Sequence, residues 1–261
     1  MRFCLGLLIL ALASVALAPT TRPATTQPSA PVPGKINVAV IWGGHPFDHP
    51  RFFNLFEGHD DIAYFPLEQK KGGESFENID DWKYDVIALY NFAQTITPKQ
   101  QENFIKLLDR GVGLFIMHHA NGAYKNWPEF WKIAGVTYYF DKRMENGKEI
   151  GRSWFKPGVT YKVHVADPDH PITRGIKDYE IVDETYCRTV IEPSVHPLLT
   201  TTEPSSDSPV GWTKTYLNAR VCYIQHGHGP LKDPNKPNAY NNENYRKLVP
   251  QAIRWVAKKS D

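Results

Sequence analysis

Two adjacent histidines stand where a buried apolar run ends. The stretch GLFIMHHA (113–120) is typical of a buried strand that leads into a turn, and His118 and His119 occupy the turn. Neutral imidazoles bind zinc and similar ions, and they also move protons near neutral pH. The pair therefore predicts a metal site or an acid–base site. An isolated pair equally fits a structural role, with one ring bonded to backbone and the other exposed.

Other polar groups with the same chemistry follow strand-like runs far away in the chain. They are His45 and His49 in GGHPFDH, Asn91 after YDVIALY, Asp183, Glu184 and Tyr186 in YEIVDETY, and His226 and His228 in IQHGHG. Alternating glycine and histidine after a strand requires backbone freedom and brings two imidazoles together, which favours function for IQHGHG. GGHPFDH also fits a plain glycine turn, and Asp183-Glu184 also fits a solvated turn.

These residue types support two kinds of chemistry. Imidazoles with a carboxylate bind a divalent metal such as zinc, and an open coordination position lowers the pKa of a bound water to about 7. The same groups support metal-free acid–base catalysis, in which a carboxylate orients an imidazole. The sequence has no Gly-rich phosphate loop, no His-Glu-x-x-His and no Gly-x-Ser-x-Gly elbow. His118 occupies the place where such an elbow carries its nucleophile.

The order of elements in the first half predicts how these groups are positioned. KINVAVIWGG (35–44), YDVIALYN (84–91) and GVGLFIMHH (111–119) are typical of buried strands. A helix is expected after Thr97-Pro98, with Thr97 as N-cap and Gly111 as its stop, and another at 126–136. Strands alternating with helices predict a parallel sheet with helices on both faces. Ligands bind outside the carboxyl ends of such strands, where these polar residues are found.

After residue 137 strands dominate the pattern. The expected strands are 161–167, 179–190, 196–203, 209–217 and 219–227, and 240–259 is expected to form a closing helix. This half predicts extra antiparallel strands that complete the sheet. Trp127, Trp131 and Trp255 are at helical core positions, whereas Trp212 could instead hold a sugar ring.

The ends and the composition set the class of protein. Residues 1–18 have the layout of a secretory signal peptide, which predicts export to the periplasm or the extracellular space. A Pro/Thr-rich linker is expected at 19–34, and one folded domain at 35–261. The formal net charge of +2, without a basic stripe, argues against a nucleic-acid partner, and no membrane contact is expected of the mature form. Cys187 and Cys222 fit either a disulfide or two buried free thiols.

The ordered set GGHPFDH, YDVIALYN, RGVGLFIMHHA, DHPITRGI, DETY, PVGWTKTY and ARVCYIQHGHG resembles the trehalose-utilisation (ThuA-like) family, from Lys35 to the final helix. The resemblance implies a flavodoxin-like α/β fold, similar to class I glutamine amidotransferases, with histidine in place of the elbow cysteine. It therefore implies no amidotransfer. It also implies a polar cluster at the positions of His45, His118, Glu184, Tyr186 and His228. Family members are linked with disaccharide catabolism, including routes through 3-keto sugars.

The leading hypothesis is an exported enzyme acting on a disaccharide or keto sugar, with a small-molecule carbohydrate as its partner. His45, His118, Glu184 and His228 are the expected catalytic groups and, if zinc or a similar metal is bound, its ligands; Tyr186, Trp212, Asn91 and His119 are expected to hold substrate. The alternative is a non-catalytic carbohydrate-binding or scaffold protein on the same fold. A hydrolase of non-sugar substrates would share the site. The oligomeric state stays open, with a homo-oligomer as one expectation.

Overall fold

The computed structural model describes residues 30–229 and 236–259. The signal peptide expected at 1–18 and the linker as far as residue 29 lie outside this part of the chain. The first strand begins at Ile36, next to the expected domain start at Lys35. Among the helices of the described residues, none is both long and apolar enough to span a bilayer.

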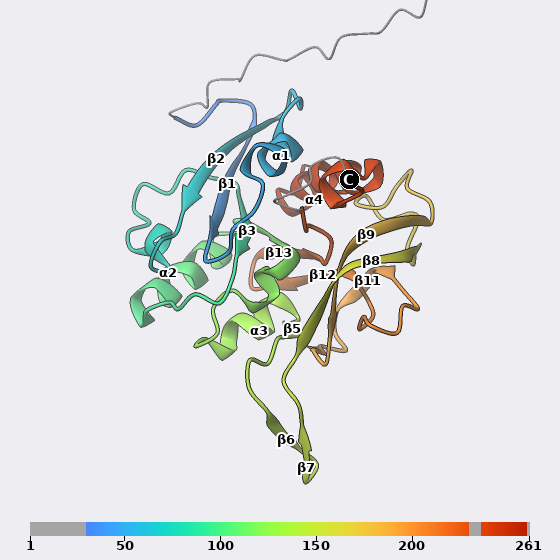
Figure 1. Ribbon diagram of the computed structural model, residues 1–261. Helices are drawn as coiled ribbons and strands as arrows, with labels where there is room; N and C mark the ends of the chain where they lie inside the picture. Colours follow the sequence, from blue (N-terminus) through green and yellow to red (C-terminus); the bar gives the residue numbers. More distant parts are fainter. Residues whose placement is uncertain (1–29, 230–235, 260–261) are drawn as a thin grey trace, which may run out of the picture.

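Five parallel strands form one half of the central sheet (Figure 1). In spatial order they are β2 (Ile62–Glu68), β1 (Ile36–Gly43), β3 (Val86–Asn91), β4 (Gly113–Met117) and β13 (Ala219–Ile224). Neighbouring strands in this half pair in parallel. The order reproduces the 2-1-3-4-5 arrangement of flavodoxin-like sheets, so the expected fold is confirmed.

Four antiparallel strands continue the sheet beyond β13. They are β12 (Gly211–Tyr216), β11 (His196–Thr200), β8 (Trp154–Val165) and β9 (Tyr179–Cys187). Each pairs antiparallel with its neighbour, and so the direction alternates from β13 outward. After four reversals β9 runs in the same sense as the parallel strands. Its carboxyl end therefore belongs to the same edge of the sheet as theirs, which the sequence could not decide.

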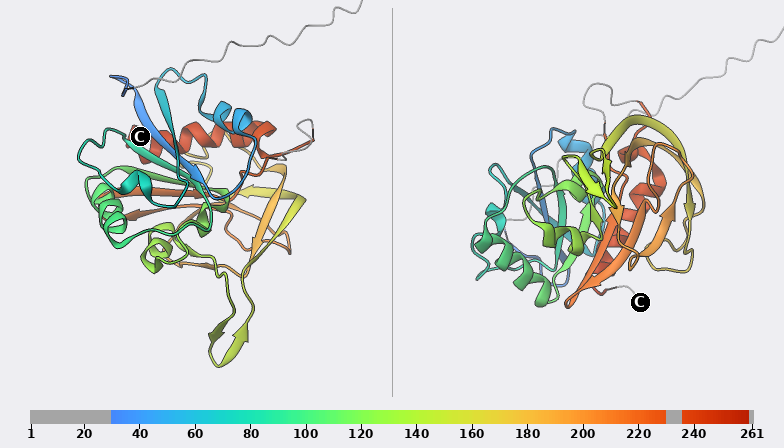
Figure 2. Two further views of the ribbon diagram at one scale, coloured as in Figure 1. Left: turned by 60° about the vertical axis from the view of Figure 1, so that its left-hand side comes forward. Right: turned by 90° about the horizontal axis from the view of Figure 1, so that it is seen from below.

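Helices cover both faces of the parallel half, as expected (Figure 2). They are α1 (His49–Phe53), α2 (Pro98–Asp109), α3 (Pro128–Ala134) and α4 (Glu243–Val256). Buried side chains of α1 and α4 share one core with Val38 and Val40 of β1, whereas those of α2 and α3 share the other with Ala39 and Ile41. The alternation along β1 explains its continuous apolar run, because both of its faces are buried.

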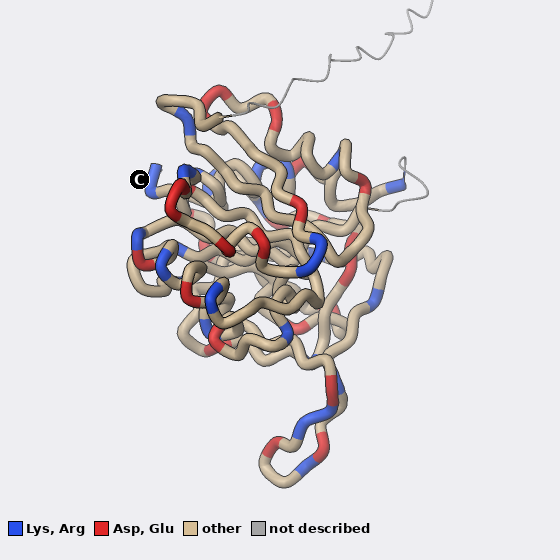
Figure 3. Tube along the Cα trace, turned by 90° about the vertical axis from the view of Figure 1, so that its left-hand side faces the viewer, with Lys and Arg blue, Asp and Glu red and all other residues tan. Residues whose placement is uncertain are grey.

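Short elements complete the chain. They are the strands β5 (Val136–Thr137) and β10 (Val190–Ile191), which pair together, the hairpin β6 (Arg143–Glu145) and β7 (Lys148–Ile150), and the 3-10 helices at Asn54–Phe56, Glu74–Phe76, His118–Gly122 and Ala239–Asn241. The hairpin projects from the body of the molecule. In the view of Figure 3, basic and acidic residues are interspersed along the trace and on this hairpin.

Helix ends follow their sequence signals. Thr97 caps α2 in a reciprocal capping box with Gln100, and Gly111 follows the helix at a φ of +87°. The sequence did not predict β2, whose run IAYFPLE contains Pro66. Proline is tolerated there because β2 is the edge strand, where a missing backbone N–H costs nothing on the open side. Cys187 and Cys222 are both buried free thiols.

Candidate functional site

His118 begins the turn after β4 in a strained backbone conformation. Its φ is +53°, a left-handed value that is rare for residues other than glycine, and the residue is fully buried. The hydroxyl of Tyr223, on neighbouring β13, donates to the His118 carbonyl at 3.1 Å and helps to hold this turn. A sharp turn of this kind, at the end of a central parallel strand, is how α/β enzymes present a reactive side chain.

A backbone contact orients the His118 ring. Its Nδ1 lies 2.8 Å from the carbonyl oxygen of Gln225, just after β13. A carbonyl only accepts, so Nδ1 carries a proton and Nε2 is left to face the site. Nε2 lies 3.5 Å from Oε2 of Glu184 and 3.1 Å from the Tyr186 hydroxyl.

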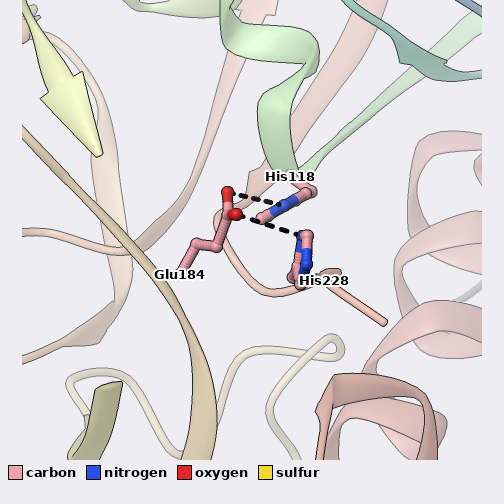
Figure 4. Close-up of side chains that lie close together, drawn as sticks. All are labelled: His118, Glu184 and His228. Carbon is pink, nitrogen blue, oxygen red and sulfur yellow. Dashed lines mark ion pairs between the residues drawn. The ribbon is translucent and has the colours of Figure 1, made fainter. Parts of the chain in front are cut away.

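Glu184 reaches the site from β9 through a β-bulge. Between the pairs Lys156–Thr185 and Val159–Asp183, two residues of β8, Pro157 and Gly158, oppose Glu184 alone. Bulges of this kind change the direction in which a side chain points and recur beside active sites. Figure 4 shows the outcome: the two oxygens of Glu184 face His118 and His228, which come from different segments. The second contact, from Oε1 to Nδ1 of His228, measures 3.3 Å.

Asp183 fixes the loop that carries His228. Its buried carboxylate accepts from the backbone N–H groups of Gly227 at 2.7 Å, His228 at 3.0 Å and Glu184 at 2.7 Å. The loop also packs tightly on His118, because a Cβ on Gly227 would lie 2.6 Å from the His118 Cβ. Asp183 therefore positions His228 and Glu184 without facing the site itself. The sequence pointed to Asp183 but gave it no role.

The surroundings shift the pKa values of the two histidines in opposite directions. Burial alone would lower the pKa of His118, yet the hydrogen bond to Glu184 and the charge of Asp183 raise it above 6.5. Burial alone would raise the pKa of Glu184, but His118 lowers it. For His228, burial and the neighbouring His118 lower the pKa to about 4. Its imidazole is therefore neutral at neutral pH, the form that binds metals.

His45 and His119 stand beside this group. The ring of His119 is 4.7 Å from that of His45 and 5.0 Å from that of His118, measured between centroids. The Nδ1 atoms of His45 and His119 are both buried without a hydrogen-bond partner among the described residues. Burial lowers the pKa of both rings, and that of His119 far more. They are neutral polar groups near the cluster, and neither belongs to the set of ligand atoms that come together.

The structure does not bring two predicted residues to the cluster. Trp212 is 1% exposed in the core formed with α2 and α3, and its indole N–H donates to the Ala134 carbonyl. It cannot stack on a sugar, because its position on β12 faces that core. Asn91 points to the same side of β3 as Leu89 and bonds Gln94, in a separate buried cluster of amides. Both predictions as substrate-binding residues are corrected.

His226 was one of the polar residues noted after β13, and it too is placed elsewhere. It is fully buried between the hydroxyls of Tyr161, at 3.1 Å from Nδ1, and Tyr179, at 2.7 Å from Nε2. Burial lowers its pKa to about 3. Residues two apart would share a face if the strand continued, but the chain turns at Gly227, whose φ is +152°, so His226 and His228 point in different directions.

One atom from each of His118, Glu184 and His228 suits a metal ion. These ligand atoms all lie within 4.8 Å of one another. With zinc bonds of about 2.0–2.1 Å, tetrahedral ligand atoms lie about 3.3–3.4 Å apart. The distances from His118 Nε2 to Oε2, 3.5 Å, and from His228 Nδ1 to Oε1, 3.3 Å, are each close to that spacing, although they end on different oxygens of Glu184. Two histidines and one carboxylate with a further open position form a donor set of catalytic zinc sites, so the residues fit the ion.

A cavity of about 300 Å³, which the sequence did not predict, opens near this group. Five of the seven residues that line it are aromatic: Phe92, Tyr138, Phe140, Trp154 and Phe155. The ring of Phe92 is 5.7 Å from that of His119, and Tyr138 is 6.1 Å from Tyr186. These residues come from loops and from the start of β8, where no periodic pattern marks them.

Comparison with known proteins places the chain among related sequences and folds. A family model described as ThuA, trehalose utilisation, matches residues 69–256, well over half of the chain. No curated protein sequence matches significantly. A solved structure described as ThuA-like, from Parabacteroides merdae, is similar with a TM-score of 0.70 and 18% identity, covering 85% of this chain and 90% of that one.

Two further solved structures have the fold. A ThuA-like protein from Bacteroides uniformis has a TM-score of 0.59 and 19% identity, covering 90% of this chain and 97% of that one. A β-galactosidase from Bacillus circulans sp. alkalophilus has a TM-score of 0.52 and 11% identity, and 84% of this chain corresponds to 30% of that one. At these identities the likeness concerns the fold alone.

Proposed function

The chain belongs to the trehalose-utilisation (ThuA) family, and we propose that it is a zinc-dependent enzyme that converts a disaccharide or keto sugar. Membership of this family supports a carbohydrate-related role. The observation that carries the proposal is the meeting of His118, Glu184 and His228, which are remote in sequence, within 4.8 Å of one another. Perturbed titratable groups gathered at the carboxyl edge of an α/β sheet are typical of active sites.

Each group of the cluster has a distinct role in this proposal. His118 through Nε2, Glu184 and His228 would hold the ion, which would supply polarisation of a substrate oxygen and activation of water. The Gln225 carbonyl keeps the proton of His118 on Nδ1, and Asp183 holds the loop of His228 in place. The Tyr186 hydroxyl, 3.1 Å from His118 and 3.3 Å from Glu184, is the hydrogen-bond donor beside them.

Glutamine amidotransfer is not part of the proposal. That reaction uses a thiolate at the strand-end turn, where this chain has His118. The two cysteines of the described residues, Cys187 and Cys222, are buried, and burial raises the pKa of both thiols. Neither thiol is suited to act as a nucleophile. We propose a reaction of hydrolase, lyase or isomerase type instead.

The test replaces the residue at the centre of the site. Full-length protein is purified without an affinity tag, its metal content is measured, and zinc binding and conversion of a 3-keto derivative of trehalose are assayed. We expect about one zinc per chain, and we expect His118→Ala to lose zinc and to lower turnover by about 10³-fold or more with an unchanged circular dichroism spectrum. His196→Ala is the matched control, since His196 is a half-exposed histidine bonded only to Asp167.

Three results would overturn the proposal. Full turnover by His118→Ala would remove the site from the chemistry. Sugar binding without any conversion, in a protein that binds no zinc, would instead support the non-catalytic alternative, a carbohydrate-binding or scaffold protein. Conversion only of esters or amides would favour a hydrolase of non-sugar substrates at the same site.

A further inference from the structure

The aromatic cavity beside the metal-binding group has one charged lining residue. Among the described residues that line it, Arg152 alone carries a charge, and no carboxylate lies within ion-pairing distance of its guanidinium. Phe92, Phe140 and Trp154 are partly exposed and Phe155 is 54% exposed, so hydrocarbon faces are open to a ligand. Aromatic faces that stay exposed around a hollow mark ligand sites more often than packing defects.

Two contacts join this cavity to the metal-binding group. Phe155 of β8 and Tyr186 of β9 are directly paired across the two strands, so their side chains share one face of the sheet. The ring of Tyr138, which also lines the cavity, lies 6.1 Å from that of Tyr186. Burial raises the pKa of Tyr138, Arg152 lowers it and Glu184 raises it, so the ring lies within reach of both charges. A ligand in the cavity therefore extends toward the cluster.

We propose that this cavity is the saccharide subsite of the enzyme and that it takes a sugar acid, whose ring lies on the aromatic side chains while its carboxylate pairs with Arg152. The inference rests on the function proposed above and narrows its substrate to a disaccharide or keto sugar that carries a carboxylate. A cavity of about 300 Å³ is at the small end of ligand sites and suits one sugar ring.

The polar groups of the cavity decide between an acidic and a neutral sugar. The Ser153 hydroxyl is already engaged, since it donates to the Arg188 carbonyl at 2.8 Å and accepts from the Tyr139 N–H at 3.0 Å. Most of the remaining lining is aromatic hydrocarbon. Arg152 and the Tyr138 hydroxyl are among the polar side-chain groups of the lining that remain. Of the two, Arg152 carries a charge, and its planar fork forms two charge-assisted hydrogen bonds with a carboxylate and weaker ones with hydroxyls.

The experiment titrates D-glucuronate and D-glucose into metal-free full-length protein by calorimetry. Removing zinc with a chelator prevents the probe carboxylate from binding the ion. We expect D-glucuronate to bind more tightly than D-glucose. Arg152→Met should weaken D-glucuronate by about tenfold or more and change D-glucose by less than about twofold. Arg152→Lys should give an intermediate loss, because the charge stays and the fork is lost.

Two further variants complete the set. Trp154→Ala should weaken both sugars, since it removes a stacking face. Arg174→Met is the matched control, because Arg174 is exposed and lies outside the cavity. Unchanged D-glucuronate affinity in Arg152→Met, equal affinity for the two sugars, or no binding of either would each overturn the proposal.

The two proposals fail in different ways. His118 does not line the cavity, so His118→Ala should lose zinc and turnover while it still binds D-glucuronate. Zinc loss without an effect of Arg152→Met would refute the sugar-acid subsite only. Arg152-dependent binding by a protein that needs neither zinc nor His118 would refute the proposed chemistry only.

Discussion

Tyr186 is the residue whose proton the site can use. Burial and the nearby Glu184 raise its pKa well above 10, so the phenol is protonated at neutral pH. A hydroxyl has one hydrogen, and here its acceptors within reach are Glu184 and, when the His118 imidazole is neutral, Nε2 of His118. If His118 and Glu184 held an ion, this hydrogen would be left for a substrate oxygen. Because a raised pKa makes this phenol a weak acid, Tyr186 is expected to donate a hydrogen bond to the substrate and not to hold the metal.

Removal of that hydroxyl tests this division of roles. In Tyr186→Phe we expect the zinc affinity to change by less than about threefold, because no ligand is lost, and kcat to fall by about 10²-fold with a smaller change in KM. Steady-state kinetics and zinc titration measure the two effects. Tyr139→Phe, at a half-buried tyrosine outside the cluster, should leave both unchanged. Unchanged kcat in Tyr186→Phe would assign the hydroxyl a structural role.

From the residue types alone, the reactive groups could be predicted, but the directions of their side chains could not. The adjacent pair His118-His119 could present either ring, and only the left-handed turn at His118 decides which one reaches Glu184. Trp212 looked equally suited to a cleft or to the core, because an aromatic residue on a strand is typical of both. Which face a side chain takes depends on partners remote in sequence, such as Ala134, and a local pattern carries no information about them.

At the scale of elements, two irregularities bring the site together. Because of the bulge opposite Glu184, two consecutive residues of β9 both contribute to the site. Asp183 binds the loop that carries His228, and Glu184 faces the imidazoles. Gly227, at a φ of +152°, lets that loop approach His118. The pattern Gly-His-Gly signalled the loop in the sequence. Nothing in the sequence signalled the bulge, because it is defined by the pairing of two strands.

The close approach at Gly227 makes a substitution there informative. Gly227→Ala should lower the free energy of unfolding by about 2–4 kcal/mol, because its Cβ overlaps His118 and its backbone is strained. It should also displace His228 and abolish zinc binding. Gly175→Ala is the control, since Gly175 has a φ of +77° with nothing within 4 Å of an added Cβ, and it should cost about 1–2 kcal/mol with normal zinc binding. Urea unfolding measures the stability of the two variants, and zinc titration measures their metal binding. Equal losses of stability and equal zinc binding in the two variants would contradict the close contact between Gly227 and His118.

At the scale of the whole molecule, the parallel half was predictable and the second half only in outline. Continuous apolar runs marked β1, β3 and β4, because those strands are buried on both faces. The direction of β9 was not predictable, since it depends on four antiparallel pairings in succession, from β13 through β12, β11 and β8 to β9. That direction decides whether Glu184 meets the histidines, so the composition of the site could be proposed from sequence but its assembly could not.

The buried histidine His226 makes the stability of the fold depend on pH. His226 is held neutral between Tyr161 and Tyr179, with a pKa of about 3 in the folded protein and an ordinary value of 6.5 in the unfolded chain. Above pH 6.5 neither state binds the proton, so stability is unaffected. As the pH falls from 6.5 toward 3, only the unfolded chain takes up the proton, and the free energy of unfolding decreases by about 1.4 kcal/mol per pH unit.

His226→Gln should remove this dependence, because glutamine is neutral throughout and still offers a donor and an acceptor. At pH 7.5 we expect the variant to be less stable than the wild type, and at pH 4.5 we expect the gap to have narrowed by about 2–3 kcal/mol. Urea unfolding of both metal-free proteins at the two pH values measures the change. Asp183 and Glu184 titrate in both proteins, so their contributions cancel in the difference. A gap that is the same at both pH values would show that His226 takes up its proton equally in the folded and unfolded states.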